Sequence, residues 1–239
     1  MTRLLAPLVV CFALPLAFTE IGTFSRRPPT RPDRAPDRQP ERVPPRPERV
    51  EARVRAPDAA QTLRQEMRRL WSEHVFWTRD YIIAAGTDGA DAPAASMRLM
   101  RNQEDLGRAL APYYGTANSE KLTDMLKQHI QIAVDLIKAA KSGDQKEFTD
   151  QDEKWKQNAQ EIAAFLSGAN PHWAKDAILE LMVAHLDTTR EEVQARLHQK
   201  WDEDVKAFDR VYAHILKMAD ALSDGIIAQF PDRFSEGGR

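Results

Sequence analysis

The sequence predicts an all-α fold, an antiparallel four-helix-bundle-like core with additional short helices, preceded by a disordered arm. Apolar residues recur at three- and four-residue spacing from residue 58 onward, without the alternation that is typical of strands. Short turns containing Gly, Pro, Asp or Ser separate the periodic segments. Long helices joined by such short turns must lie side by side in opposite directions, so the pattern favours a bundle.

Six helices are expected. They cover residues 58–85, 93–111, 119–141, 146–167, 171–187 and 190–229. Asn170-Pro171 is expected to begin the fifth helix, and Thr189 with Glu192 resembles a capping box for the sixth. The sixth helix is long, and we expect a kink or break near Lys200–Asp204.

Composition divides the chain into three parts. We expect a signal peptide or membrane anchor at residues 1–25, a disordered Pro/Arg-rich linker at 26–57 and the all-helical bundle at 58–239. Residues 4–18 are uncharged, but this run is shorter than the ~20 residues that span a bilayer as a helix. Residues 26–57 contain ten Arg and nine Pro, with almost nothing apolar to bury.

Charge is distributed unevenly along the chain. Residues 1–57 carry eleven Arg and six acidic residues, a net charge of +5, which leaves −7 for the rest of a chain whose total is −2. We do not expect nucleic-acid binding, because five carboxylates dilute the charge of residues 26–57 and no aromatic residue there can stack on a base. The single cysteine, Cys11, excludes a disulfide framework and a thiolate metal site.

Localisation and partners depend on the first residues. A cleaved signal peptide would export the protein, an uncleaved segment would hold it at a membrane, and a misassigned start codon would leave it cytoplasmic. Contact with a membrane through the N-terminus is therefore one expected interaction. A protein partner or a homodimer is the other.

Four histidines recur in equivalent positions on separate helical segments, and they are the candidate metal ligands. Each is followed by an aliphatic residue and, six residues later, by an acid; the histidines are His74, His129, His185 and His214, and the acids are Asp80, Asp135, Glu191 and Asp220. Six residues rotate a helix face by roughly 120°. The histidine can therefore face the bundle interior while the acid faces a neighbouring helix, where it can pair with a histidine or an arginine.

Three interpretations of the pattern are open. The imidazoles could converge on a divalent transition metal or a small ligand, with carboxylates orienting them. They could form a buried polar network, each bonded to an acid, that fixes the packing of the helices. The pattern could also be a by-product of helical amphipathicity, because apolar neighbours follow from helix spacing alone.

Known metal and nucleotide signatures do not fit the sequence. No histidine has the Glu-x-x-His spacing of di-iron bundles, and none of the four candidate histidines has a carboxylate or histidine four or five residues after it. Cys-x-x-Cys-His is absent, and so are the glycine-rich nucleotide loops. Other polar residues fall among apolar rows: Gln103, Asn158, Arg79 and Arg101. We expect them to join a polar network, with the arginines paired to Asp80, Asp135 or Asp220.

Several short motifs in order give the chain a resemblance to a family of small bacterial helical-bundle proteins. The motifs are HVFWTR at 74–79, RNQ at 101–103, YYG at 113–115, LKQHI at 126–130, AAKSGD at 139–144, HLDTT at 185–189 and GIIAQFP at 225–231. The resemblance covers about residues 62–234 and implies a bundle without an established activity. Members of that family sometimes carry automatic names such as glycosyltransferase or acetylglutamate kinase, although the nucleotide-binding fold that such names require has no sequence signal here.

The leading functional hypothesis from the sequence is a non-enzymatic bundle that binds a metal or small ligand through its core histidines. The alternatives are a structural or protein-interaction bundle whose histidines form a packing network, and an acid–base enzyme that uses a His–Asp pair.

Overall fold

The structure is a computed structural model of the chain, and it describes residues 58–235. These residues form five α-helices and one short 3-10 helix, with no strand among them, so the predicted all-α bundle is confirmed. The elements are α1 (Ala59–Gly86), α2 (Ala92–Ser142), α3 (Gln145–Ala169), α4 (Lys175–Leu197), α5 (Trp201–Gln229) and η1 (Pro231–Arg233). No helix of this part of the chain is long and apolar enough to span a bilayer. The segments predicted at 1–25 and 26–57 lie outside the described residues.

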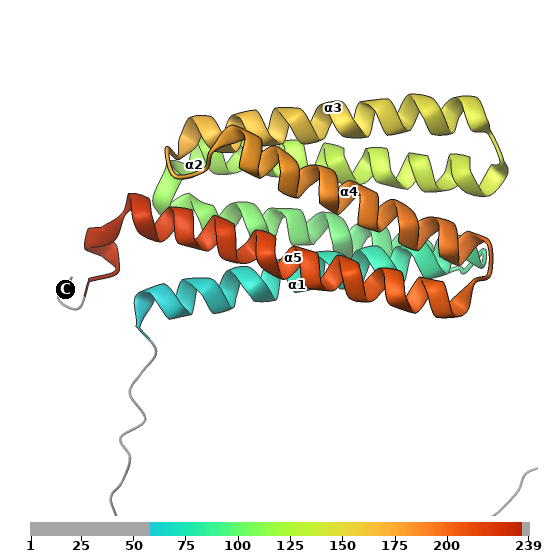
Figure 1. The fold of residues 1–239 in the computed structure, drawn as a ribbon, viewed down its shortest axis with the longest axis horizontal. Helices are drawn as coiled ribbons and strands as arrows, with labels where there is room; N and C mark the ends of the chain where they lie inside the picture. Colours follow the sequence, from blue (N-terminus) through green and yellow to red (C-terminus); the bar gives the residue numbers. More distant parts are fainter. Residues whose placement is uncertain (1–57, 236–239) are drawn as a thin grey trace, which may run out of the picture. The chain divides into compact units, whose positions relative to one another are not determined.

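Helix α2 consists of two antiparallel halves that meet at Gly115. Gly115 has φ 79° and ψ 165°, a conformation that costs glycine little and other residues more. The chain reverses there, so that consecutive helical segments alternate in direction along the bundle (Figure 1). The six predicted helical segments are therefore present. The prediction of a loop between residues 111 and 119 is wrong, because the chain stays helical on both sides of Gly115 and includes Pro112.

The boundary between the last two helices also differs from the prediction. Helix α4 runs without a break from Lys175 to Leu197, and the chain turns at residues 198–200, next to the expected break. Thr189 and Glu192 lie inside α4 and are buried, so they do not cap a helix. Asn170 closes α3 and does not begin α4. The capping-box prediction failed because both side chains face the bundle interior, where Glu192 has a charged partner on α1.

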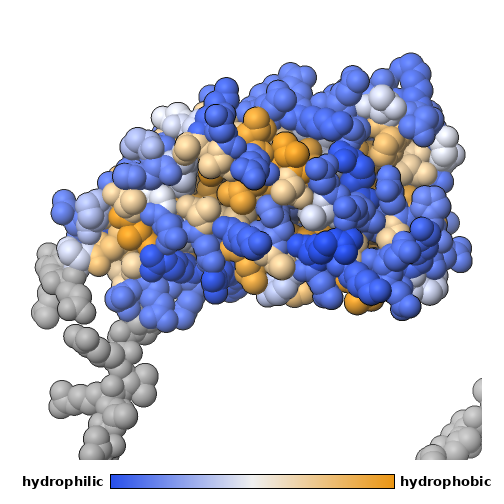
Figure 2. Space-filling view, in the orientation of Figure 1, coloured by the Kyte–Doolittle hydropathy of each residue, from blue (hydrophilic) through white to orange (hydrophobic). Residues whose placement is uncertain are grey.

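Two apolar clusters form the core. The larger cluster draws on all five helices, and the smaller one lies near the α1–α2 and α4–α5 turns. Buried polar side chains of α1, α2, α3 and α4 lie among the apolar residues of these clusters. We call this set the polar layer: His74, Asn102, Gln103, His129, Asn158, His185 and Thr189. The surface seen in Figure 2 is mostly hydrophilic, with apolar residues gathered in patches between charged ones.

Candidate functional site

Three of the four predicted histidines meet inside the polar layer. His74 of α1, His129 of the second half of α2 and His185 of α4 are 2%, 2% and 4% exposed. The His185 ring lies between the other two, with centroid distances of 5.5 Å to His74 and 6.1 Å to His129. Trp71 and Trp155 flank the group, at 5.5 Å from His74 and 5.3 Å from His129. Five aromatic rings thus run across the bundle interior.

Hydrogen bonds fix the tautomer of His129. Trp155 Nε1 donates to His129 Nε2 over 3.0 Å, and an indole N–H can only donate. Nε2 therefore carries no proton, and the ring proton is on Nδ1, which donates to Asn158 Oδ1 over 2.8 Å. The Asn158 amide nitrogen donates to the Met125 carbonyl, which fixes the orientation of the amide. Both nitrogens of His129 are thus occupied by neutral partners.

His74 is held in the opposite tautomer. Its Nδ1 lies 3.2 Å from the side-chain nitrogen of Gln103, which also donates to the Leu99 carbonyl over 2.9 Å. An amide nitrogen cannot accept, so Nδ1 of His74 is the acceptor and the ring proton is on Nε2. Asn102 lies beside this contact: its Oδ1 is 3.2 Å from the same Gln103 nitrogen, which has only two hydrogens to share among its three neighbours, and its own nitrogen donates to the Leu70 carbonyl of α1.

His185 differs from its two neighbours in having a buried nitrogen without a partner. Its Nδ1 makes no hydrogen bond within residues 58–235, and the same holds for the hydroxyl of Thr189, one turn further along α4. Both residues line a small cavity beside His74 and His129, and the volume open to the centre of a water molecule in it is about 20 Å³. That space is sufficient for about one water molecule. The polar layer therefore has two unpartnered polar atoms on α4, and Gln103 Oε1 of α2 is a third.

Burial keeps all three imidazoles neutral. Desolvation and, to a smaller extent, the nearby His129 lower the pKa of His74 to about 3, against the opposing effect of Gln103 and Asn102. Desolvation also lowers the pKa of His129 to about 4. The pKa of His185 lies well below its usual range, first because of burial and then because of the neighbouring histidines. A proton on Nε2 of His129 would in addition face the Trp155 N–H.

The fourth histidine is placed elsewhere. His214 of α5 is only partly buried, and its Nε2 lies 2.8 Å from the Leu181 carbonyl, to which it donates. No ring contact joins it to the other three histidines within the described chain. The sequence prediction of four equivalent positions is therefore fulfilled for three of them, because α5 presents His214 to the α4 backbone.

None of the four acids pairs with a histidine within residues 58–235, and the other expected partner, an arginine of a neighbouring helix, is found for two of them. Asp220 pairs with Arg68 and Glu191 pairs with Arg210, while none of the four acids is buried. His74, His129 and His214 are bonded to amides, an indole and a carbonyl instead, and His185 Nδ1 has no partner. Arg79 does enter a buried ion cluster, but with Glu192 and Asp204, and Arg101 is exposed.

The ion cluster lies beside the polar layer, between α1, α4 and α5. Arg79 is 2.6 Å from Glu192 and 2.9 Å from Asp204, and Arg196 is 3.3 Å from Asp204. Both carboxylates are nearly inaccessible, at 1% and 2% exposure. Burial raises the pKa of Glu192 to about 7 in spite of the adjacent Arg79. Phe208 covers the outer side, with its ring centroid 4.7 Å from the guanidinium carbon of Arg79.

Sequence reasoning missed several members of this region. Trp155 has no place in the histidine pattern of the sequence, and Thr189 and Glu192 were expected at a helix start. The spacing of Trp155 and Asn158 on one face of α3 is the signal that could have joined them to a histidine. The partners of Arg79 had no such signal, because they come from the other end of the sequence.

The three buried histidines have few free atoms with which to bind a metal ion or a ligand. Within residues 58–235, no three His, Cys, Asp or Glu side chains are placed to hold a metal ion. The Nε2 lone pair of His129 and the Nδ1 lone pair of His74 are already hydrogen-bonded, which leaves His185 as the histidine with a free buried nitrogen.

The chain was compared with protein-family models, curated proteins and solved structures, and none of them matches it.

Proposed function

We propose that the chain is a non-enzymatic helical bundle in which the three buried histidines form a neutral packing network. The observation that carries this proposal is that both nitrogens of His129 are bonded to neutral side chains, one as donor and one as acceptor. Such a bond pattern joins α2 to α3 in a single register, because either partner would lose its bond if the helices slid past each other. The contact of His74 with Gln103 joins α1 to α2 in the same way.

Metal binding is the second candidate, and one observation favours it. His185 Nδ1 and Thr189 Oγ1 are buried, unpartnered and next to a space of atomic size. Three neutral imidazoles in ring contact also provide the protonation state that a metal requires. The bond pattern argues against this candidate, because a metal with three histidine ligands would have to displace Trp155 from His129 and Gln103 from His74. No carboxylate lines the cavity to balance the charge of a divalent ion.

The acid–base alternative has less support. A general acid or base works best with a pKa near the working pH, whereas the pKa values of His74 and His129 are lowered to about 3 and 4. The acids that were expected to complete a His–Asp pair bind arginines on the surface.

Metal analysis tests the packing proposal against the metal candidate. The chain is purified without a histidine tag, its metal content is measured by mass spectrometry, and its melting temperature is followed with Zn²⁺, Cu²⁺, Ni²⁺ and Fe²⁺. We expect no stoichiometric metal and no rise in melting temperature. One equivalent of metal that is lost in His185→Gln and retained in His214→Gln would overturn the packing proposal in favour of a metal site.

We also propose that the bundle binds a protein partner or forms a homodimer. Exposed aromatic and aliphatic side chains on α1 and α5 support this proposal. Phe76 of α1 is 50% exposed and contacts Phe208 and Tyr212 of α5, and Val205 and Trp201 of α5 are also about half exposed, at 54% and 51%. Apolar residues grouped on a surface are typical of interaction sites. Light scattering on the purified chain over a range of concentrations measures self-association. Export or membrane attachment through residues 1–25 stays a prediction, which fractionation of cells that express the full chain tests.

A further inference from the structure

The cavity beside the histidines has polar groups in its wall, and α4 supplies two of them. His185 and Thr189 lie one turn apart on α4, and both line this cavity. Side chains four residues apart on a helix are neighbours on one face, so one small molecule can contact both. His185 Nδ1 and Thr189 Oγ1 are buried and have no partner within residues 58–235. Buried polar atoms without a partner cost free energy, so this part of the wall favours a ligand that bonds to both.

His74 offers a third polar group to the same cavity. It lines the cavity together with His185, and the centroids of the two rings are 5.5 Å apart. Its Nδ1 accepts from Gln103, so its ring proton is on Nε2, and that N–H is a donor. His129 lines the cavity too, but both of its nitrogens are already bonded. The wall therefore combines a donor on α1 with two unpartnered atoms on α4.

The size and the chemistry of this wall fit one water molecule. The volume open to the centre of a water molecule is about 20 Å³, which is enough for about one water. Buried waters usually have about two to four polar partners. A water molecule both donates and accepts, so it can bond to His185 Nδ1 in either tautomer and to the Thr189 hydroxyl, which also does both. No carboxylate lines the cavity, so a cation would lack a counter-charge there.

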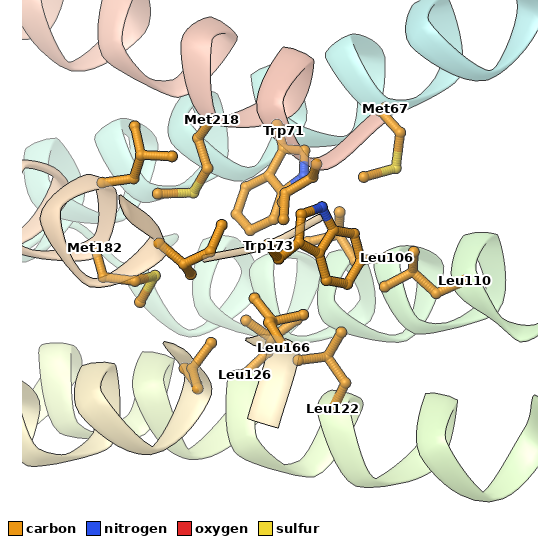
Figure 3. Close-up of a pocket in the computed structure, with 14 residues that line it drawn as sticks. Met67, Trp71, Leu106, Leu110, Leu122, Leu126, Leu166, Trp173, Met182 and Met218 are labelled. Atoms are coloured by element: carbon orange, nitrogen blue, oxygen red, sulfur yellow. The ribbon is translucent and has the colours of Figure 1, made fainter. Parts of the chain in front are cut away.

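A second cavity, inside the larger apolar cluster, has the same size and a different wall (Figure 3). The volume open to the centre of a water molecule is again about 20 Å³. Leucine, isoleucine, methionine and tryptophan side chains line it, and none of them has a nitrogen or oxygen that accepts a hydrogen bond. The indole nitrogen of Trp173 lies against Gly225 of α5, which is not part of this wall. A water molecule here would lose the bonds of both its hydrogens, so we expect this cavity to be dry.

We propose that the cavity beside the histidines binds one water molecule, which bonds to His185 Nδ1, Thr189 Oγ1 and the Nε2–H of His74. This proposal rests on the neutral packing network, because the tautomer that makes His74 a donor belongs to that network. The bonds of His74 and His129 join α1, α2 and α3, whereas Nδ1 of His185 makes none. A water that bonds to α1 and α4 would connect α4 to the same network, since a bridging water is nearly as favourable as a direct hydrogen bond.

Methyl groups can locate the water, because they do not exchange protons with the solvent. Val193 and Leu136 line the cavity beside the histidines, Leu126 and Ile162 line the second cavity, and all four are buried. Nuclear Overhauser effects between water and these methyl groups are measured on the full chain, labelled with ¹³C in its methyl groups. We expect effects at Val193 and Leu136 with the sign of a long-lived contact. Leu126 and Ile162 are the internal control and should show none.

Oxygen-17 relaxation dispersion counts long-lived waters and tests which side chain holds this one. Thr189→Val removes the hydroxyl and keeps nearly the same shape, so it should lower the count by about one. Thr188→Val is the matched control and should leave the count unchanged, because the Thr188 hydroxyl donates to the Ala184 carbonyl of its own helix. Thr189→Ser keeps the hydroxyl and should keep the water.

Three results would overturn the proposal. The absence of water effects at Val193 and Leu136 would show that the cavity beside the histidines is dry. Effects of equal strength in the two cavities would show that the polar atoms do not select the water. An equal water count in Thr189→Val and Thr188→Val would remove Thr189 from the site.

The test is independent of single variants and of the packing proposal. If Thr189→Val fails to fold, which circular dichroism detects, the comparison of the two cavities in the unaltered chain still decides. A dry cavity would leave the two bonds of His129 in place. Failure of the packing proposal would instead appear as a stoichiometric metal that depends on His185, so the two failures are distinct.

Discussion

The neutral state of the buried histidines predicts how the stability of the bundle depends on pH. His129 has a folded pKa of about 4, whereas an imidazole in an unfolded chain has a pKa near 6.5. Between these values the unfolded chain binds a proton that the folded chain does not. The stability contributed by His129 is therefore complete above about pH 6.5 and is lost as the pH falls toward 4.

The magnitude follows from the size of the shift. One pKa unit corresponds to about 1.36 kcal/mol, so the shift of His129 is equivalent to about 3 kcal/mol over the whole window. Between pH 6 and pH 5 the free energy of unfolding should fall by about 1 kcal/mol because of this residue alone. His74 and His185 have lowered pKa values too, and the same argument applies to each. A domain with a total stability of ~5–15 kcal/mol should therefore unfold in mild acid.

Glu192 changes the pH dependence of stability in the opposite direction, so its effect has to be separated from that of the histidines. Its folded pKa is raised to about 7, above its usual value near 4.3. Its contribution is therefore complete at low pH and is lost as the pH rises through about 7. Because the two effects overlap, a single pH curve of the unaltered protein does not isolate His129.

A comparison of variants isolates it. Urea unfolding, followed by circular dichroism, gives the free energy of unfolding at several pH values for the unaltered chain, His129→Gln and His198→Gln. Between pH 6 and pH 5, the free energy of unfolding of the His129 variant should fall by about 1 kcal/mol less than that of the unaltered chain, whatever the absolute stability of the variant. His198 is exposed, and its variant should keep the original slope. Identical slopes for all three proteins would refute the conclusion that His129 is buried in its neutral form.

Three further substitutions test other contacts. Trp155→Phe leaves Nε2 of His129 buried without a donor and should lower the free energy of unfolding by about 1–3 kcal/mol, in addition to the effect of the smaller ring. In a double-mutant cycle with His129→Leu, strict additivity of the two effects would contradict the hydrogen bond. Arg79→Met leaves buried Glu192 unpaired and Asp204 with Arg196 alone, and it should cost about 3–5 kcal/mol at pH 8, with a smaller loss at pH 5, where Glu192 is protonated. Equal losses at the two pH values would show that Glu192 is not the titrating group. Gly107→Ala places a Cβ against Thr123 and should lower the melting temperature by several degrees, whereas an unchanged melting temperature would mean that the two halves of α2 are further apart than the structure has them.

The helices were predictable because their signals are local. Apolar spacing identified six helical segments, and the structure has six once α2 is divided at Gly115. The errors are at positions where a tertiary contact overrides a local signal. Thr189 and Glu192 have the residue types of a capping box, but they are buried inside α4, where Glu192 meets Arg79 of α1. The sequence carries no information about that approach, because 113 residues separate the two partners.

The site was predictable only in part, for a similar reason. Helical spacing places His74, His129 and His185 on inward faces, and the structure confirms that they are buried together. The atoms that these histidines bond depend on how neighbouring helices are shifted along the bundle axis. The periodicity of the sequence does not specify that shift. His214 shows that the spacing alone does not identify the bonding partner, because its side chain meets a backbone carbonyl of α4 and not the other histidines.

The pairing of the acids with arginines and not with histidines has a physical cause that also explains the bonds of the histidines. A rotation of roughly 120° away from a buried histidine brings an acid to the edge of the interior. Arginines of neighbouring helices can reach this edge, as Arg68 does for Asp220 and Arg210 for Glu191. A carboxylate that moved inward to an imidazole would lose its water, and the ion pair would have to offset several kcal/mol for each charge. Amides and an indole bond His74 and His129 without charge, so a neutral polar layer is the arrangement that an apolar core tolerates at the lower free energy.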